Sequence, residues 1–201
     1  RHTSTPEQAA WSSKWSSPVH WVVCLRSRRS GRVYARFYPS RGDKAPVRMT
    51  GNSLPERRDP ASFRDPSGFV YRDRSGCLLR QINPSYEPHY RLFLSSGLYD
   101  ELVCDGLLIP HGEASLDRRY DEEAVAVLAP KEIPVISYPY EWCFSQYRAA
   151  ADLTLEVQRR AMKRGMTLKD ASAYNIQFEG IRPRFIDTLS FEKWEAGSPW
   201  R

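Results

Sequence analysis

The alternation of hydrophobic and polar residues predicts a chain that mixes strands with helices. Short apolar or alternating runs bounded by turn residues are typical of strands. They fall at residues 69–71, 77–82, 124–128, 133–138, 176–178 and 184–186. Apolar residues that recur every three or four positions are typical of helices. They fall at residues 86–96, 98–108 and 145–164. The pattern therefore predicts an α+β fold.

The helix expected over residues 145–164 has the clearest period. One apolar face of it is formed by Phe144, Tyr147, Ala151, Leu155 and Met162. Arginines and lysines weight its last turns, where cations complement the helix dipole. The glycine at position 165 is placed to end the helix in the left-handed conformation.

Two pairs of neighbouring strands are separated by short turns and predict hairpins. The first pair, 69–71 and 77–82, is joined by the polar turn 72–76, and the second, 176–178 and 184–186, surrounds Glu179-Gly180. The loop 111–121 between helix and strand is highly charged, which indicates solvent exposure. Its histidine, His111, is a minor catalytic candidate.

Charge divides the chain into two parts. Residues 1–50 contain ten Lys and Arg against two Asp and Glu, whereas the remainder is close to neutral. We expect residues 1–62 to form a basic extension that is disordered or non-native. The alternative is that residues 21–25 and 32–37 form two short strands. Residues 63–201 form the folded module. Because the first methionine is Met49, a native start near that residue is a further expectation.

The basic stretch 26–32 offers nucleic-acid binding as a third, weaker interpretation, which we do not adopt. The four cysteines have no metal-site spacing and are expected to be unpaired, buried or half-buried thiols of a reducing compartment. The apolar run 20–25 is too short for a signal peptide or a membrane span. These features predict a cytoplasmic protein with no membrane association.

Three polar residues close to predicted strand ends form the candidate site. Asp170 and Asn175 bracket a loop after the long helix, and Asp187 follows the second hairpin. This D-x4-N, hairpin and Asp order resembles the large lobe of protein kinases and small-molecule phosphotransferases. The resemblance implies that Asp170 is catalytic, that Asn175 and Asp187 hold Mg²⁺ and thereby ATP, and that the fold is two-lobed and kinase-like.

Two features complicate the kinase-like interpretation. No lysine occurs between positions 44 and 131, so Arg80 is the substitute for the phosphate-clamping lysine. The first hairpin has no G-x-G-x-x-G motif. The same polar residues also have structural readings, in which Asp170 caps a turn, Asn175 bonds loop backbone and Asp187 caps the next segment. The aromatic segment 139–142 is read either as a connector between lobes or as packing at a strand-to-helix junction.

A second resemblance covers most of residues 63–200. The segments FRDPSGFVYR, SSGLYDELVCDGLLIPH, EWCFSQ, LTLEVQRRAMKRGMTLKDASAYNIQF and FIDTLSFE are similar to the N-terminal region of a bacterial class I S-adenosylmethionine-dependent methyltransferase family, some of whose members are called nodulation proteins. The resemblance implies S-adenosylmethionine as cofactor and a C-terminal methyltransferase domain as partner. The eleven glycines are isolated and form no cofactor-binding turn in this chain.

The sequence thus leaves its enzymatic status undecided. The first hypothesis is an N-terminal accessory or recognition module of a methyltransferase-family protein, with an unknown substrate and with methyl transfer carried elsewhere. The alternative is a small phosphotransferase dependent on Mg²⁺ and ATP that uses Asp170, Asn175 and Asp187.

Overall fold

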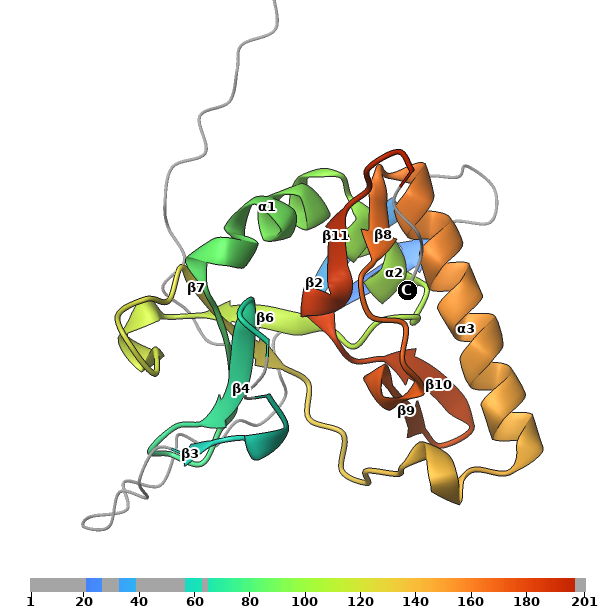
Figure 1. Cartoon of the computed structure of the whole chain (residues 1–201), viewed down its shortest axis with the longest axis horizontal. Coiled ribbons are helices and arrows are strands. Elements are labelled where there is room, and N and C mark those ends of the chain that lie inside the picture. Colours follow the sequence, from blue (N-terminus) through green and yellow to red (C-terminus); the bar gives the residue numbers. More distant parts are fainter. Residues whose placement is uncertain (1–20, 27–32, 39–56, 63–64, 198–201) are drawn as a thin grey trace, which may run out of the picture.

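A computed structural model describes residues 21–26, 33–38, 57–62 and 65–197, and it has the predicted α+β fold (Figure 1). The first half contains β1 (Trp21–Arg26), β2 (Val33–Tyr38), β3 (Arg57–Arg58), β4 (Gly68–Arg72), β5 (Leu78–Ile82), α1 (Glu87–Ser95), α2 (Leu98–Cys104), β6 (His111–Ala114) and β7 (Ala126–Pro130). The second half contains α3 (Phe144–Lys163), β8 (Met166–Leu168), β9 (Ile176–Glu179), β10 (Arg182–Phe185) and β11 (Phe191–Lys193).

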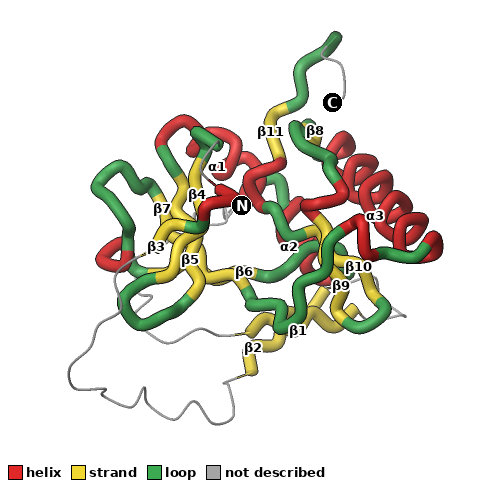
Figure 2. The backbone as a smooth tube through the Cα atoms, turned by 60° about the horizontal axis from the view of Figure 1, so that its bottom comes forward, coloured by secondary structure: helices red, strands yellow, loops and turns green. Residues whose placement is uncertain are grey.

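The paired strands of the described residues run antiparallel. Five of them form one sheet in the order β3-β4-β5-β7-β6, and the other pairs are β1–β2, β8–β11 and β9–β10. Both predicted hairpins are confirmed, as β4–β5 and β9–β10. Figures 1 and 2 show the five-stranded sheet at one side of the molecule and α3 at the other, with β8–β11 and β9–β10 between them.

Three predicted boundaries differ from the structure. The strand expected at 133–138 is absent, because Pro134 interrupts this segment and Val135 and Ile136 lie in solvent. The charged loop 111–121 begins instead with strand β6 on the edge of the sheet. Helix α2 stops at Cys104 because the chain turns through Gly106 in the left-handed conformation.

The two strands given as the alternative for the first quarter are present as β1 and β2. Strand β3 pairs with β4, so the five-stranded sheet includes residues 57–58. Residues 59–62 are described as well and contain a short 3-10 helix at Pro60–Ser62. The rest of the expected basic extension lies outside the described residues. Cys77 and Cys143 are free and exposed, whereas Cys104 is disulfide-bonded. The expectation of four buried or half-buried free thiols was therefore right about the free state of Cys77 and Cys143 but wrong about their burial, and it was wrong about the pairing of the half-buried Cys104.

Helix α3 begins and ends as predicted, but its periodic apolar face is the outer one. Its buried side is formed by smaller or polar residues: Ala150, Leu153, Thr154, Val157, Gln158 and Ala161. The predicted apolar face, from Phe144 to Met162, lies in solvent. Gly165 follows the helix with φ of 72°, as expected for a C′ glycine.

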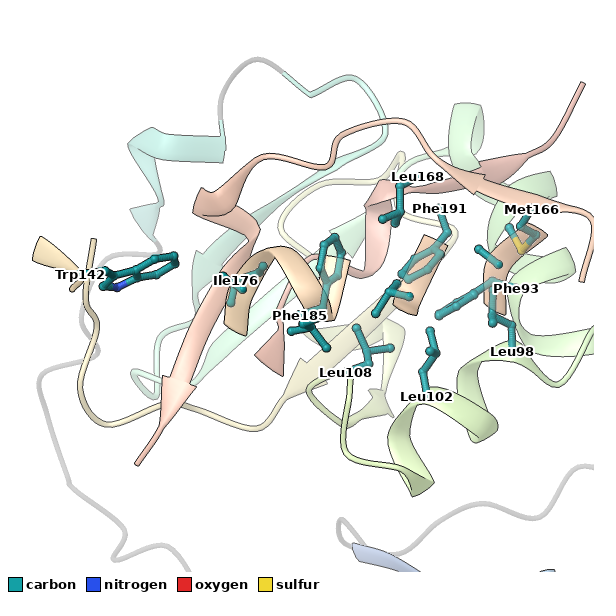
Figure 3. Packing of buried hydrophobic residues seen from close by; sticks show 14 residues of the cluster. Phe93, Leu98, Leu102, Leu108, Trp142, Met166, Leu168, Ile176, Phe185 and Phe191 are labelled. Atoms are coloured by element: carbon teal, nitrogen blue, oxygen red, sulfur yellow. The ribbon is translucent and has the colours of Figure 1, made fainter. Parts of the chain in front are cut away.

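The largest hydrophobic cluster joins the helices to the short strands of the second half (Figure 3). Phe93 of α1 stacks on Phe191 of β11 with ring centroids 4.5 Å apart, and Phe185 of β10 meets Phe191 edge-on at 5.8 Å. Phe93 is far from the other two in sequence, and all three are fully buried. Packing of this kind fixes the C-terminal strands against the helices.

The five-stranded sheet is covered on both faces. Because successive strand residues alternate between faces, Leu79 packs with Phe69 and Tyr71 on one side, and Ile82 packs with Tyr86 on the other. The second face also receives Leu189, which follows the β9–β10 hairpin. A residue from the C-terminal half thus enters the core beside the sheet.

Gly68 tests how closely the backbones of β4 and β5 approach each other at the start of β4. A Cβ atom at this position would fall well inside contact distance of the Gln81 carbonyl oxygen, and close to Leu189. We expect Gly68→Ala to lower the free energy of unfolding by at least about 2 kcal/mol in urea denaturation. Gly76→Ala is the matched control, since it has positive φ and no neighbouring atom, and it is expected to cost about 1 kcal/mol. Equal losses in the two variants would contradict the close approach.

Candidate functional site

An ion pair between Arg80 and Asp187 joins the two halves of the molecule. Arg80 lies on β5 in the interior of the sheet, and Asp187 follows β10, 107 positions later in the sequence. The side chains are only 17% and 16% exposed. Asp187 also accepts hydrogen bonds from the Leu189 backbone N–H at 3.1 Å and from the Ser190 hydroxyl at 2.6 Å. Both carboxylate oxygens are therefore engaged by protein donors.

The pKa of Asp187 is lowered by these neighbours in spite of burial. Burial by itself raises the pKa of the carboxyl group, but the charge of Arg80 and the hydrogen bonds from Ser190, Arg80 and Leu189 outweigh it. The carboxylate is thus held in its charged form. A buried charge of this kind requires its partner, because removing one member leaves the other unpaired.

A second ion pair lies close to the first. The Lys169 ammonium group is 3.3 Å from Asp65 Oδ1 and donates a hydrogen bond of 2.7 Å to the Ser67 hydroxyl. It also lies 5.4 Å from the ring centroid of Tyr86. This pair connects the loop that carries the predicted catalytic residue to the turn before β4.

Tyr86 lies between the two ion pairs and is fully buried. Its hydroxyl donates to the Thr188 carbonyl at 3.0 Å and reaches the Phe191 carbonyl at 2.5 Å. Burial raises its pKa well above the ordinary value, and the nearby charge of Asp187 adds to that effect. We define the charged cluster as Arg80, Asp187, Lys169 and Asp65 around Tyr86. It connects the sheet to the C-terminal half through two ion pairs and the Tyr86 hydroxyl.

The three residues predicted for the site are linked only in part. The Asn175 side-chain N–H group lies 3.3 Å from the Ser190 hydroxyl, which in turn donates to Asp187. The same amide is 3.3 Å from the Asp170 backbone carbonyl. The Asp170 carboxylate is exposed and accepts the backbone N–H of Ser172 at 2.9 Å, so it caps its own turn. Each of the structural readings of these residues is therefore realised.

The predicted magnesium ligands do not fit Mg²⁺ in this arrangement. Mg²⁺ is held by oxygen atoms, usually those of one or two carboxylates, with near-ideal octahedral geometry. The Asp187 oxygens instead accept bonds from Arg80, Leu189 and Ser190. In the described part of the chain, no group of three or more His, Cys, Asp or Glu side chains is arranged to hold a metal ion. Ion binding at Asp187 therefore requires the pair with Arg80 to open.

His111 begins strand β6 and lies beside Thr188, the residue that follows Asp187. Its Nδ1 atom is 3.5 Å from the Thr188 hydroxyl, its ring centroid is 4.4 Å from that of Tyr99, and the Tyr99 hydroxyl bonds its backbone N–H and carbonyl. Burial and the nearby charge of Arg80 lower the pKa of His111 to about 3. The imidazole is thus neutral near pH 7, which excludes a role as a permanent cation beside Arg80.

The segment from the sheet to α3 is fixed by a buried glutamine. The Gln177 side chain accepts the Ser137 backbone N–H at 2.9 Å and donates to the Ser137 carbonyl at 3.0 Å. Trp142 donates to the Ser137 hydroxyl at 2.9 Å and packs edge-on against Phe178. Within the expected connector 139–142, the backbone N–H groups of Glu141 and Trp142 are bonded to the carbonyls of Tyr138 and Pro139 at 2.8 and 3.1 Å. Aromatic packing at the junction is the reading that the structure favours.

Sequence reasoning identified Arg80 and Asp187 but missed the partners that complete the cluster. Asp65, Ser67 and Tyr86 carry no local signal, because they meet Lys169 only through contacts across more than 80 residues of chain. The one available hint was Lys169 itself, a cation directly before a candidate catalytic aspartate.

Comparison with known proteins gives one informative similarity. The chain is 37% identical over 147 residues to nodulation protein NoeA of Rhizobium meliloti (strain 1021), which corresponds to 71% of this chain and 30% of the relative. The chain thus spans less than a third of that protein's length. No family model matches it. Within the described ranges, the helices are too short or too polar to cross a bilayer.

The first prediction from the site concerns the stability supplied by the ion pair. Arg80→Met leaves the Asp187 carboxylate buried without its partner, and we expect a loss of about 3 kcal/mol in the free energy of unfolding. Adding Asp187→Asn is expected to recover at least about 1 kcal/mol relative to the sum of the single changes. Glu132→Gln, which opens the exposed pair with Arg72, is the control and is expected to cost less than about 1 kcal/mol. Additive effects of the two buried changes would refute the coupling.

The second prediction concerns acid. Because the folded-state pKa of Asp187 is lowered below its ordinary value, the stability that it supplies is complete above the unfolded-state pKa of about 4. That contribution is lost as the pH falls through the folded-state pKa. The stability difference between the wild type and Asp187→Asn, measured in urea, is expected to stay constant from pH 7 to about 5 and to shrink below the unfolded-state pKa. A difference that grows on acidification would contradict the assignment.

Proposed function

We propose that this chain acts as a recognition module of a nodulation-type protein, with methyl transfer carried by a separate domain. The observation that carries the proposal is the similarity to NoeA, which extends over most of this chain but over only 30% of that protein. The 147 matched residues are the size of one typical domain. The similarity to the methyltransferase family supplies the proposed chemistry of the remainder.

The architecture supports a non-catalytic role in methyl transfer. The nucleotide-type cofactor fold is built from parallel strands with crossover helices and a glycine-rich turn. The described strands here pair antiparallel, and the glycines of the chain are isolated. The charged cluster uses its polar groups to join one half of the molecule to the other. These features suit a rigid module that presents a surface better than one that holds S-adenosylmethionine.

The proposal predicts how S-adenosylmethionine binding is distributed. Titration calorimetry of this chain with the cofactor is expected to give no heat of binding up to millimolar concentration. A protein of the relative's length is expected to bind the cofactor equally well with and without the matched region. Micromolar binding by the chain alone would overturn the proposal. A longer protein without cofactor affinity would remove the methyltransferase part of it while leaving the module assignment intact.

Nucleotide binding at the charged cluster is the second proposal. It is favoured by the order of elements, in which a sheet bearing Arg80 precedes the long helix, the loop of Asp170 and Asn175, and the hairpin that ends at Asp187. That order is similar to a kinase-like fold. Binding would have to replace Asp187 as the partner of Arg80, because both side chains are already paired.

Thermal shift with ATP, in the presence and absence of Mg²⁺, tests this second proposal. A ligand present at 100 times its Kd raises stability by about 2.7 kcal/mol, which is easily detected as a shift in Tm. We expect any such shift to disappear in Arg80→Met and to persist in the surface control Glu132→Gln. The absence of a shift in the wild type at millimolar nucleotide would exclude the second proposal and leave the first untouched.

A further inference from the structure

Helix α3 has two apolar sides, and one of them is uncovered. Along its outer side, Phe144 is 81% exposed, Tyr147 44%, Leu155 56% and Met162 51%, and Ala151 lies among them in solvent. Their spacing places them on one side of the helix. We call these five residues the outer stripe. It runs for about 27 Å along a helix that Figure 1 shows at the outside of the molecule.

The outer stripe differs from the isolated apolar residues that most protein surfaces expose. Single exposed apolar residues are common on soluble proteins, whereas a contiguous apolar surface marks an interaction site. The buried side of α3 already packs against the rest of the fold through Leu153, Val157 and Ala161. Tyr147 also meets the Trp142 ring edge-on, with ring centroids 5.6 Å apart, whereas the side chains of Phe144, Leu155 and Met162 make no ring contact and no hydrogen bond within the described part of the chain. Four of the five residues in the outer stripe are large, and their exposure is an energetic cost that a partner would remove.

We propose that the outer stripe binds a second copy of this chain, with the two α3 helices packed antiparallel about a two-fold axis. In a two-fold antiparallel pair, residues whose numbers have a constant sum face each other. With the axis at position 153, Phe144 faces the partner's Met162. Ala151 faces the partner's Leu155, so that a small residue meets a large one. The stripe is thus complementary to itself in one register.

The charged flank of α3 opposes this register and limits its strength. Arg148 and Arg159 lie on the same flank, so Arg159 comes near the partner's Arg148. Asp152, which is 71% exposed and pairs weakly with Arg148 at 4.0 Å, comes near the partner's Asp152 beside the axis. Two carboxylates close together repel one another. The assembly is therefore expected to be weak and to strengthen when that repulsion is removed.

The size of the contact also fits a weak dimer. Side chains of this size offer about 150–200 Å² each, so the exposed share of the outer stripe amounts to about 500 Å² per copy. Two copies would bury about 1,000 Å² in all, which is the lower bound for a specific interface. The neighbouring exposed aromatics Tyr138 and Tyr140, stacked with ring centroids 5.5 Å apart, lie close to the start of the helix in sequence.

Sedimentation velocity over a concentration series from low to several hundred micromolar tests the proposal. The wild type is expected to approach twice the monomer mass with rising concentration. Leu155→Glu combined with Met162→Glu is expected to weaken self-association at least tenfold, and Asp152→Asn to strengthen it severalfold. Ile181→Glu is the control, because Ile181 is 93% exposed on the β9–β10 turn and lies outside the interface. Circular dichroism and urea denaturation verify that each variant remains folded.

Three outcomes would overturn the proposal. One is a wild type that stays monomeric at every concentration. Another is self-association that Leu155→Glu with Met162→Glu leaves unchanged. The third is a stripe whose substitution instead abolishes binding to the remainder of a longer, NoeA-like protein, with no effect on self-association. That last result would identify another domain of the longer protein, and not a second copy of this chain, as the partner of the outer stripe.

Discussion

The fold depends on a buried ion pair that joins residues 107 positions apart. Arg80 on the sheet and Asp187 after the last hairpin are each mostly removed from water, and each is costly to bury alone. The pair positions the segment that carries Leu189 into the core beside the sheet and Phe191 against Phe93. The Tyr86 hydroxyl fixes the same segment from the sheet side. The ion pair, the Tyr86 hydrogen bonds and the packing of Leu189 and Phe191 therefore all fix residues 187–191.

Local structure was predictable wherever the signal was local. The β4–β5 and β9–β10 hairpins, the end of α3 at Gly165 and the α+β class all followed from turn residues and periodicity. The strand expected at 133–138 is absent because the prediction gave the apolar residues more weight than Pro134. A proline cannot donate the hydrogen bond that a strand ladder needs. The apolar period of α3 marked its outer side, since the inner side is built from smaller residues around Ala150 and Ala161. Period alone does not distinguish a core face from an interface.

The candidate site shows the same division between local and long-range information. Sequence spacing named Asp170, Asn175 and Asp187, and Arg80 as the substitute clamp. The structure brings Arg80 to Asp187 and connects Asn175 to Asp187 through Ser190, but it turns the Asp170 carboxylate to its own loop. Residues that complete the arrangement, such as Asp65 and Tyr86, had no signal in a single sequence. Polar residues at strand ends thus identified a region of the molecule without determining whether it binds a ligand or supports the fold.

Native-state hydrogen exchange tests most directly whether Arg80 and Asp187 join the two halves. If they do, amides of β5 and of residues 185–191 open together in the wild type, with the same free energy of opening. In Arg80→Met, the protection of β5 is expected to fall only with the global free energy of unfolding. Residues 185–191 are expected to lose at least about tenfold more in exchange rate than β5, or about 1.4 kcal/mol. An equal loss at β5 and at residues 185–191, or no loss at residues 185–191, would contradict this account.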